Sequence, residues 1–443
     1  MINRRTFLSR VSKASLAGAS APLWLNLVSA QAFAQAGSGY KAVVLVSLPG
    51  GNDGNNMLVP MDSTEYGEYA SIRGSSLALQ PGSLNVLQGT VNGKTYGLHP
   101  SLGNVASLYN QKRALMVANV GPLRTPATKA QLQADSTLLP EALLGHPQQL
   151  AQWESATTFA APVTGWGGRM ADLFTAQSGS LPALIDAGPS SIFTVGSVVQ
   201  GIAVQADGGD LVALPTGMDA AILAVAQAES QSPNAIISQA AQLRVLSAKQ
   251  QVVLRQAQAA GAGLQTAFPA SGFGNVLKTI AQVMAGRAVI GAARQIFYCT
   301  QGGYDTHQNQ WPQQAGQLAD LDAGLAAFMK ALDELGLANQ VLVCTHSDFN
   351  RTMQANSTQG TDHAWGNHQI ILGGGIQGGR ILGQMPTLEL GGSSDLGNLG
   401  TWIPTTSVTQ MTASVGSWMG LNRAQLASVF PDLANFPTGA LSL

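Results

Sequence analysis

Four of the six histidines of this chain lie between residues 296 and 368, together with several aspartates. The segment 303–307 (GYDTH) follows one short apolar run, and the segment 345–348 (THSD) follows the next. Residues 362–368 (DHAWGNH) add one more aspartate and two histidines. Carboxylates and neutral imidazoles are ligands of divalent metal ions such as zinc and manganese. These residue types therefore point to a metal site.

The two apolar runs, at 296–299 and 341–344, have the character of buried β-strands. Between them, residues 317–335 carry leucines and other apolar residues at helical spacing, and Gly336 ends the helix. A strand, a crossover helix and a second strand form a βαβ unit, so we expect the two strands to be parallel. Asp305 and Asp348 then emerge at the same edge of the sheet, where ligands of open α/β sheets bind.

A third aspartate, Asp53, follows an earlier apolar run at 41–48. The glycine-rich segment 49–56 (PGGNDGNN) allows a sharp turn that would bring Asp53 to the carboxyl end of this strand. The alternative is a polar turn in which Asp53 caps a helix.

The metal hypothesis joins acidic and imidazole side chains from these separate segments. Two ions close together would polarise a nucleophile and clamp a phosphoryl-like group. The alternative is that these side chains cap helices or form hydrogen bonds in the crevice. His99 and His146 are expected to be structural, or to support ligands rather than bind the metal. The expected site holds one or two divalent ions (zinc, manganese or calcium), and its candidate ligands are Asp53, Asp305, His307, Asp348, His363 and His368.

Two further residues are candidates for catalysis. Arg351 follows Asp348 closely and would bind an anionic substrate group, or else is an ordinary surface arginine. Ser101 stands where a helix is expected to begin, so the helix dipole would favour its oxyanion. The alternative for Ser101 is an N-cap. Water activated by a metal would need no side-chain nucleophile.

The amino terminus predicts export. Residues 3–8 (NRRTFL) carry a twin-arginine pattern, a weakly apolar segment follows at 14–28, and Ala34-Gln35-Ala36 has the spacing of a cleavage site. We therefore expect residues 1–36 to be a twin-arginine signal peptide and the mature protein to be periplasmic or secreted. The twin-arginine translocase would be a partner during export. No later stretch is long and apolar enough to predict a membrane helix.

Composition limits the remaining classes. The chain has 443 residues, 45% of them hydrophobic and only 10% charged, and its formal net charge is −1. This balance gives no electrostatic argument for nucleic acid binding. Two cysteines cannot build a disulfide framework. We expect residues 37–443 to form one largely parallel α/β domain, with short β-runs at 180–215 forming a hairpin subdomain and a helical insertion at about 217–268.

The chain carries a twin-arginine leader and the segments 50–55 (GGNDGN), 97–100 (GLHP), 164–166 (TGW), 303–307 (GYDTH), 347–352 (SDFNRT), 361–368 (TDHAWGNH) and 403–406 (IPTT). Together these motifs resemble those of a large secreted bacterial family, the domain of unknown function 1501 family, which is placed in the alkaline phosphatase/sulfatase-like superfamily. The resemblance implies a three-layer, alkaline-phosphatase-like sandwich. It also implies metal ligation by Asp53, Asp305, His307, Asp348 and one of His363 or His368.

Two functions from different classes follow. The first is an exported metal-dependent hydrolase of phosphate or sulfate esters, in which Arg351 binds the anion and either water or Ser101 attacks. The second is a non-catalytic exported binding or assembly protein that keeps the fold with a degenerate metal site. The partner is accordingly a small anionic ester or another exported protein.

Overall fold

The apolar runs around the candidate ligands meet in one central sheet. The computed structural model describes residues 39–205 and 218–443. The strands of the sheet are β1 (Lys41–Ser47), β5 (Ala114–Gly121), β6 (Leu184–Asp186), β7 (Ile202–Ala203), β8 (Arg294–Thr300), β9 (Val341–His346), β12 (Asn367–Gly373), β13 (Ile381–Gly383) and β14 (Thr406–Ser407).

Strand order in this sheet is β13-β5-β12-β9-β1-β8-β6-β7, with β14 beside β5. The central strand β1 pairs in parallel with β8 on one side and with β9 on the other. The loops that carry Asp53, Asp305 and Asp348 therefore leave the sheet at one edge, as expected. Only β12 runs antiparallel to its neighbours β5 and β9.

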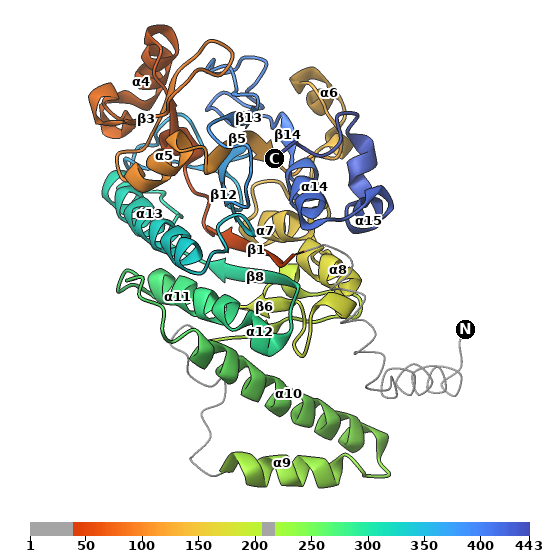
Figure 1. Cartoon of the computed structure of the whole chain (residues 1–443). Coiled ribbons are helices and arrows are strands. Elements are labelled where there is room, and N and C mark those ends of the chain that lie inside the picture. Colours follow the sequence, from red (N-terminus) through yellow and green to blue (C-terminus); the bar gives the residue numbers. More distant parts are fainter. Residues whose placement is uncertain (1–38, 206–217) are drawn as a thin grey trace. The chain divides into compact units, whose positions relative to one another are not determined.

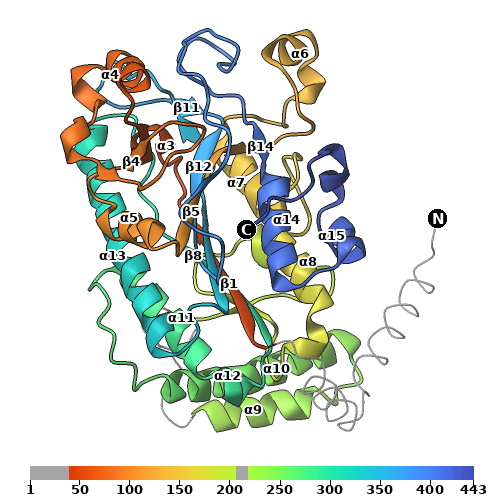
Figure 2. The ribbon, with the colours of Figure 1, turned by 45° about the horizontal axis from the view of Figure 1, so that its top comes forward.

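Helices cover both faces of the sheet, which gives three layers (Figures 1 and 2). One face carries α5 (Gly103–Asn110), α11 (Gly272–Ala285) and α13 (Gln310–Glu334). The other face carries α7 (His146–Ser155), α8 (Trp166–Leu173) and α14 (Val408–Met419), with α15 (Arg423–Val429) outside α14. The predicted fold class, a largely parallel sheet flanked by helices, is confirmed.

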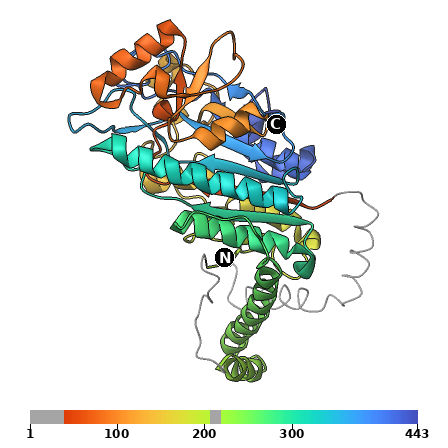
Figure 3. The same ribbon diagram turned by 60° about the vertical axis from the view of Figure 1, so that its left-hand side comes forward.

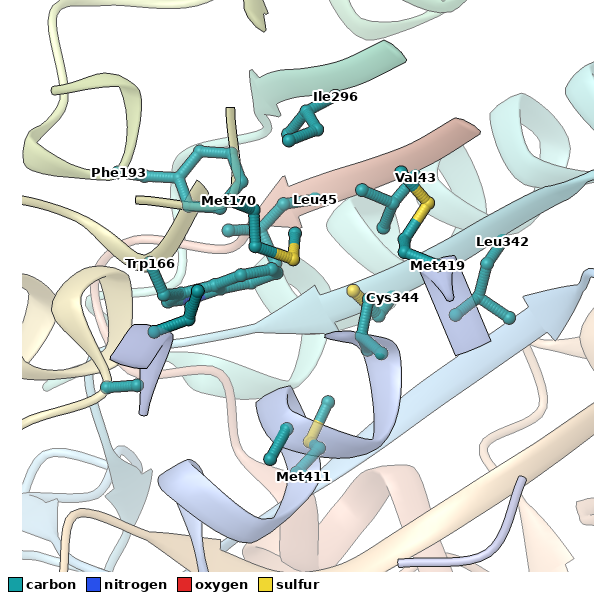
Figure 4. Packing of buried hydrophobic residues seen from close by; sticks show 14 of the residues in the cluster. Val43, Leu45, Trp166, Met170, Phe193, Ile296, Leu342, Cys344, Met411 and Met419 are labelled. Carbon is teal, nitrogen blue, oxygen red and sulfur yellow. The ribbon is translucent and has the colours of Figure 1, made fainter. Parts of the chain in front are cut away.

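The core on the face covered by α8 and α14 contains every second side chain of the central strands. Val43 and Leu45 of β1 point to the same side as Ile296 of β8 and Cys344 of β9, because side chains alternate along a strand. Met411 and Met419 of α14 and Trp166 and Met170 of α8 pack on this layer (Figure 4). Both cysteines are buried free thiols.

Smaller elements complete the chain. Among the described residues, two small sheets lie outside the main one, a three-stranded sheet β2-β4-β3 and a β10–β11 pair. The bounds of the remaining elements are α3 (Gly54–Met57), β2 (Leu58–Pro60), α4 (Ser63–Leu77), η1 (Pro81–Ser83), β3 (Asn85–Val86), β4 (Tyr96–Leu98), α6 (Lys129–Ala134), η2 (Ser136–Leu138), η3 (Thr175–Gln177), η4 (Ile192–Thr194), α9 (Met218–Glu229), α10 (Ala235–Ala260), α12 (Arg287–Ile290), β10 (Asn350–Arg351), β11 (His363–Ala364) and η5 (Pro431–Asn435).

The prediction of a hairpin subdomain at 180–215 is wrong for the described residues of this range. β6 pairs in parallel with β8, and β7 pairs in parallel with β6, so both strands extend the main sheet. The expected insertion at about 217–268 contains the helices α9 and α10. Of these, α10 packs on α11 and α12 (Figure 3).

Residues 1–36, the expected signal peptide, lie outside the described residues. Within the described residues, none of the helices combines the length and the hydrophobicity that crossing a bilayer requires.

Helix α5 is capped from a distant helix rather than from its own sequence. Its N-cap position is Leu102, not Ser101, and Leu102 offers no side-chain acceptor. Asp322 of α13 replaces the cap, because its carboxylate accepts from the backbone amides of Asn104 (3.1 Å) and Val105 (2.8 Å). We expect Asp322→Ala to destabilise the fold by about 1–3 kcal/mol, because the first turn of α5 loses the acceptor of two backbone amides, of which that of Val105 is buried. Urea unfolding measures this change. Asp322→Asn keeps one acceptor oxygen and should lose less, and equal losses would contradict the capping role.

Candidate metal centre

Three imidazoles converge on one carboxylate beyond the carboxyl edge of the sheet. The Nε2 atom of His307 lies 3.2 Å from Oδ1 of Asp305, and the Nε2 atoms of His146 and His363 lie 3.7 and 3.9 Å from the same oxygen. Nε2 of His307 also lies 2.9 Å from Nε2 of His363. Ligand atoms of His146, Asp305 and His363 all lie within 4.8 Å of one another, a spacing that could hold a metal ion.

The second nitrogen of each ring faces an oxygen acceptor. Nδ1 of His146 lies 2.7 Å from Oδ2 of Asp348, and Nδ1 of His307 lies 3.1 Å from Oδ1 of Asp362. Nδ1 of His363 lies 2.9 Å from the backbone carbonyl of Leu144. A carbonyl or an ionised carboxylate only accepts, so each Nδ1 carries the hydrogen and each Nε2 of a neutral ring presents its lone pair. Metal-binding histidines have this arrangement.

The three Nε2 lone pairs then point toward one another and toward the carboxylate of Asp305. Because these groups repel one another, the arrangement needs a positive charge between them. A proton or a metal ion would supply it. Burial lowers the pKa of His363 below its usual value, so at neutral pH this ring does not supply the positive charge by taking up a proton. The donor set, three imidazoles and one carboxylate, suits zinc or a similar divalent ion. The residues therefore fit a bound metal.

Three separate segments bring these four groups together. Asp305 and His307 lie in the loop after β8, His363 begins β11, and His146 is the first residue of α7. The ring of Phe349 packs against two of the imidazoles, with centroid distances of 4.7 Å to His146 and 4.4 Å to His363, and these two imidazoles lie 4.4 Å from each other. The side chain of Asp305 is 54% exposed and that of His307 is 44% exposed, so the cluster opens to solvent.

Arg351 fixes the orientation of the Asp305 carboxylate. Its Nη2 donates to Oδ1 of Asp305 at 2.5 Å, and its other hydrogen bonds go to the carbonyls of Gly50, Gly51, Tyr304 and Thr361. Although burial acts to raise it, the pKa of Asp305 is held below its usual value by this guanidinium and the nearby histidines. The Arg351 side chain is fully buried, so its role in the structure is to position Asp305.

Asp53 makes a different set of contacts. Its carboxylate accepts from Nη2 of Arg73 at 2.5 Å, from Nε2 of Gln310 at 2.5 Å and from the amide of Asn55 at the start of α3. Both side chains of the Asp53–Arg73 pair are fully buried. The helix-capping alternative from the sequence is thus present, and none of these partners is a histidine.

Of the remaining predicted residues, Asp348 contacts the cluster, whereas His368 and Ser101 make hydrogen bonds to other residues. Asp348 supports His146 and also accepts from the amide of Gly50 at 3.1 Å. His368 is buried, and its Nδ1 accepts from the amide of Asn119. Ser101 precedes α5, and its amide donates to Nδ1 of His99. These hydrogen bonds place Asp348 directly behind the cluster, while Ser101 bonds to a different histidine.

His146 is the member of the cluster that the sequence did not assign as a ligand. It lies 159 positions before Asp305, at the first turn of a helix from another layer. The one available signal was the segment 145–147 (GHP), in which Pro147 at the start of α7 marks a helix start and so fixes where the ring leaves the chain.

A buried polar layer lies beneath the cluster, between the edge of the sheet and α7. Polar atoms of Ser47, Trp153, His346 and Asp348 are buried there without a protein partner among the described residues. Nearby, the hydroxyl of Tyr298 donates to Glu154 at 2.6 Å. Buried polar atoms normally bind ordered water, so we expect water molecules in this layer.

Glu154 makes stability depend on pH. Burial raises the pKa of its carboxyl from 4.5 to about 7. The folded state then holds the proton more tightly, so this group stabilises the fold at low pH and the contribution is lost as pH rises toward 7. Glu154→Gln removes the titrating carboxyl. The free energy of unfolding of this variant, relative to that of the parent protein, should therefore be about 2–3 kcal/mol higher at pH 8 than at pH 5. Urea unfolding at both pH values tests this, and an equal difference at both would contradict it.

Comparison with solved structures gives distant similarities. The lipoteichoic acid synthase LtaP from Listeria monocytogenes is 8% identical, with a TM-score of 0.33 over 90% of this chain and 76% of that one. The phosphonate monoester hydrolase of Agrobacterium radiobacter is 10% identical, with a TM-score of 0.36 over 86% and 74%. The PsFucS1 sulfatase from Pseudoalteromonas sp. is 11% identical, with a TM-score of 0.30 over 82% and 68%.

No curated protein matches the sequence. A family model, described as a protein of unknown function (DUF1501), matches residues 40–430, which include the whole sheet and all four groups of the cluster. The chain therefore belongs to the DUF1501 family, as its motifs predicted.

Proposed function

We propose that this protein is an exported, metal-dependent hydrolase of phosphate or sulfate esters. The observation that carries the proposal is the convergence of three Nε2 atoms on Asp305, with every Nδ1 within hydrogen-bonding distance of an oxygen. His146, Asp305, His307 and His363 would hold one divalent ion. When bound, such an ion polarises an ester oxygen and makes water a stronger nucleophile.

The surrounding residues have supporting roles in this proposal. Asp348 and Asp362 fix the orientation of two histidines, and Arg351 holds the carboxylate of Asp305 toward them. The exposed side of Asp305 and His307 would be the face where a small anionic ester approaches. Export through the twin-arginine translocase belongs to the same proposal and rests on residues 1–36.

The test is a metal analysis of the purified protein followed by a screen of phosphate and sulfate esters. We expect about one divalent ion per chain and turnover that disappears in Asp305→Ala. Metal without turnover of any ester would support the second candidate, a non-catalytic exported protein with a degenerate site. One observation favours that candidate: Arg351 is fully engaged by the chain itself, and Asp53 is paired with Arg73.

Support from Asp348 should be visible in metal affinity. We expect Asp348→Asn to weaken zinc binding by about 10–100-fold, because the amide is a poorer acceptor for Nδ1 of His146. Competition titration with a chelating dye measures this change. Asp362→Asn is the matched control. Asp362 supports His307 from a 53% exposed position, so we expect a smaller loss there. A larger loss for Asp362→Asn would contradict the role of Asp348.

A further inference from the structure

The buried polar layer beneath the cluster has the metal centre at one end and a buried carboxyl group at the other. At the first end, Oδ2 of Asp348 lies 2.7 Å from Nδ1 of His146, while Oδ1 of the same carboxylate is buried and has no hydrogen-bond partner among the described residues. At the second end, Glu154 of α7 accepts a hydrogen bond of 2.6 Å from the hydroxyl of Tyr298. The layer therefore lies between Glu154 and a residue that supports a proposed metal ligand.

Strand geometry places the groups between these two ends side by side. Ser47 of β1 and His346 of β9 are register partners, so their side chains leave the sheet on the same face. Tyr298 of β8 lies on this face as well, because it is the register partner of Leu45, two positions before Ser47. The ring centroid of Trp153 in α7 lies 5.9 Å from that of His346. Polar side chains thus follow one another across the three central strands, beneath α7.

The hydrogen-bonding needs of this layer match water better than an ion. Among the atoms that lack a partner in the described part of the chain, Nε1 of Trp153 only donates and Oδ1 of the Asp348 carboxylate only accepts. Burial lowers the pKa of His346 to about 3, so its ring is neutral and offers one donor and one acceptor. The hydroxyl of Ser47 can do both. An anion would face Asp348 and a cation would face the N–H of Trp153, whereas water satisfies both.

Glu154 holds a proton near neutral pH. Burial raises the pKa of its carboxyl from 4.5 to about 7, and the charges of Asp348 and of Asp186 in β6 act in the same direction. Hydrogen bonds with Tyr298 and Ser191 act in the opposite direction and favour the ionised form. Both neighbouring charges are negative, so a positive charge placed nearby would shift this balance toward ionisation.

A divalent ion at the metal centre would supply such a charge. His146 and Glu154 are eight positions apart on α7, which corresponds to about 12 Å along the helix. Two positive charges at this distance lower the pKa of a buried carboxyl by roughly one to two units when the effective dielectric constant is about 20–40. The helix that carries a proposed ligand therefore also carries a group that senses the ion.

We propose that Glu154 is the proton store of the metal centre, and that binding of a divalent ion expels its proton through water held in the buried polar layer. This inference rests on the metal binding that belongs to the proposed function. One proton leaves the carboxyl and passes to solvent, so the negative charge left on Glu154 offsets part of the charge of the ion. Metal binding then weakens at low pH, where the proton competes with the ion.

Calorimetric titration of the full metal-free chain with zinc tests the inference. Titration at pH 6.5 in two buffers with different heats of ionisation gives the number of protons released per zinc. The parent protein is expected to release about 0.5–0.7 proton more than Glu154→Gln, which has no titrating carboxyl at this position. Asp186→Asn is the matched control. Burial raises the pKa of Asp186 to about 6, but its carboxylate bonds to the amide of Gly188 and the hydroxyl of Thr194 rather than to the layer. Proton release by this control should stay close to that of the parent protein.

Infrared spectroscopy tests the water path. The carbonyl band of the protonated Glu154 carboxyl, identified by its absence in Glu154→Gln, should shift soon after transfer into heavy water and should weaken when zinc is added. A band that heavy water does not shift contradicts a hydrated layer.

The outcomes separate this inference from the proposed function. Bound zinc with equal proton release by the parent protein and Glu154→Gln overturns the inference alone, as does an equal fall in Asp186→Asn. A chain that binds no zinc in equilibrium dialysis overturns the proposed function and this inference together.

Discussion

Replacing His363 by alanine is expected to weaken binding of a divalent ion by more than about 100-fold, beyond the loss typical of supporting residues. The ring supplies one of three Nε2 atoms around Asp305, and its Nδ1 is fixed by the carbonyl of Leu144. Its removal leaves His307 without the neighbouring nitrogen at 2.9 Å. Isothermal titration of metal-free protein with zinc measures the change directly.

The same variant separates metal binding from folding. Zinc at about 100 times its dissociation constant should stabilise the parent protein by about 2.7 kcal/mol, and His363→Ala should lose this gain. Gln308→Ala is a suitable control, because Gln308 is exposed beside His307 and its side chain makes no hydrogen bond with the cluster. Undiminished zinc stabilisation of His363→Ala would show that the ion binds elsewhere.

Replacing Arg73 by methionine is expected to cost about 3–5 kcal/mol of stability, because Asp53 would remain as a buried charge without its partner. The double variant Arg73→Met/Asp53→Asn should recover much of this loss, since both charges are then absent. Guanidinium chloride unfolding of the two single variants and the double variant gives the coupling energy. Additive losses would contradict a coupled buried pair.

Asp53 also tests the composition of the centre. Because its carboxylate contacts Arg73, Gln310 and the start of α3, we expect Asp53→Asn to retain its metal. If this variant loses the ion while circular dichroism shows an intact fold, Asp53 is a metal ligand, as the family resemblance implies.

The sequence predicted the elements around the centre because their signals are local. Each of the strands β1, β8 and β9 is a short apolar run followed by polar residues, and α13 carries a long leucine stripe. Parallel pairing of β1 with β8 and β9 follows from crossover connections, so the shared edge could be inferred. Asp305, His307 and His363 stood out there by residue type alone.

The features that could not be predicted from the sequence depend on contacts between residues far apart in the chain. Pairing of β6 with β8 joins short strands without any local signal of direction. The contact of His146 with Asp305 joins two layers. The engagement of Arg351 with four backbone carbonyls is equally invisible in a sequence, where an arginine beside an aspartate suggests a free cation.

The most direct test of the account is X-ray absorption spectroscopy of the zinc-loaded protein, together with the triple variant His146→Ala/His307→Ala/His363→Ala. The account predicts one zinc per chain, with about three imidazole nitrogens and a carboxylate oxygen at about 2.0–2.2 Å, and no bound zinc in the triple variant. A parent spectrum without imidazole scattering, or stoichiometric zinc in the triple variant, would contradict it.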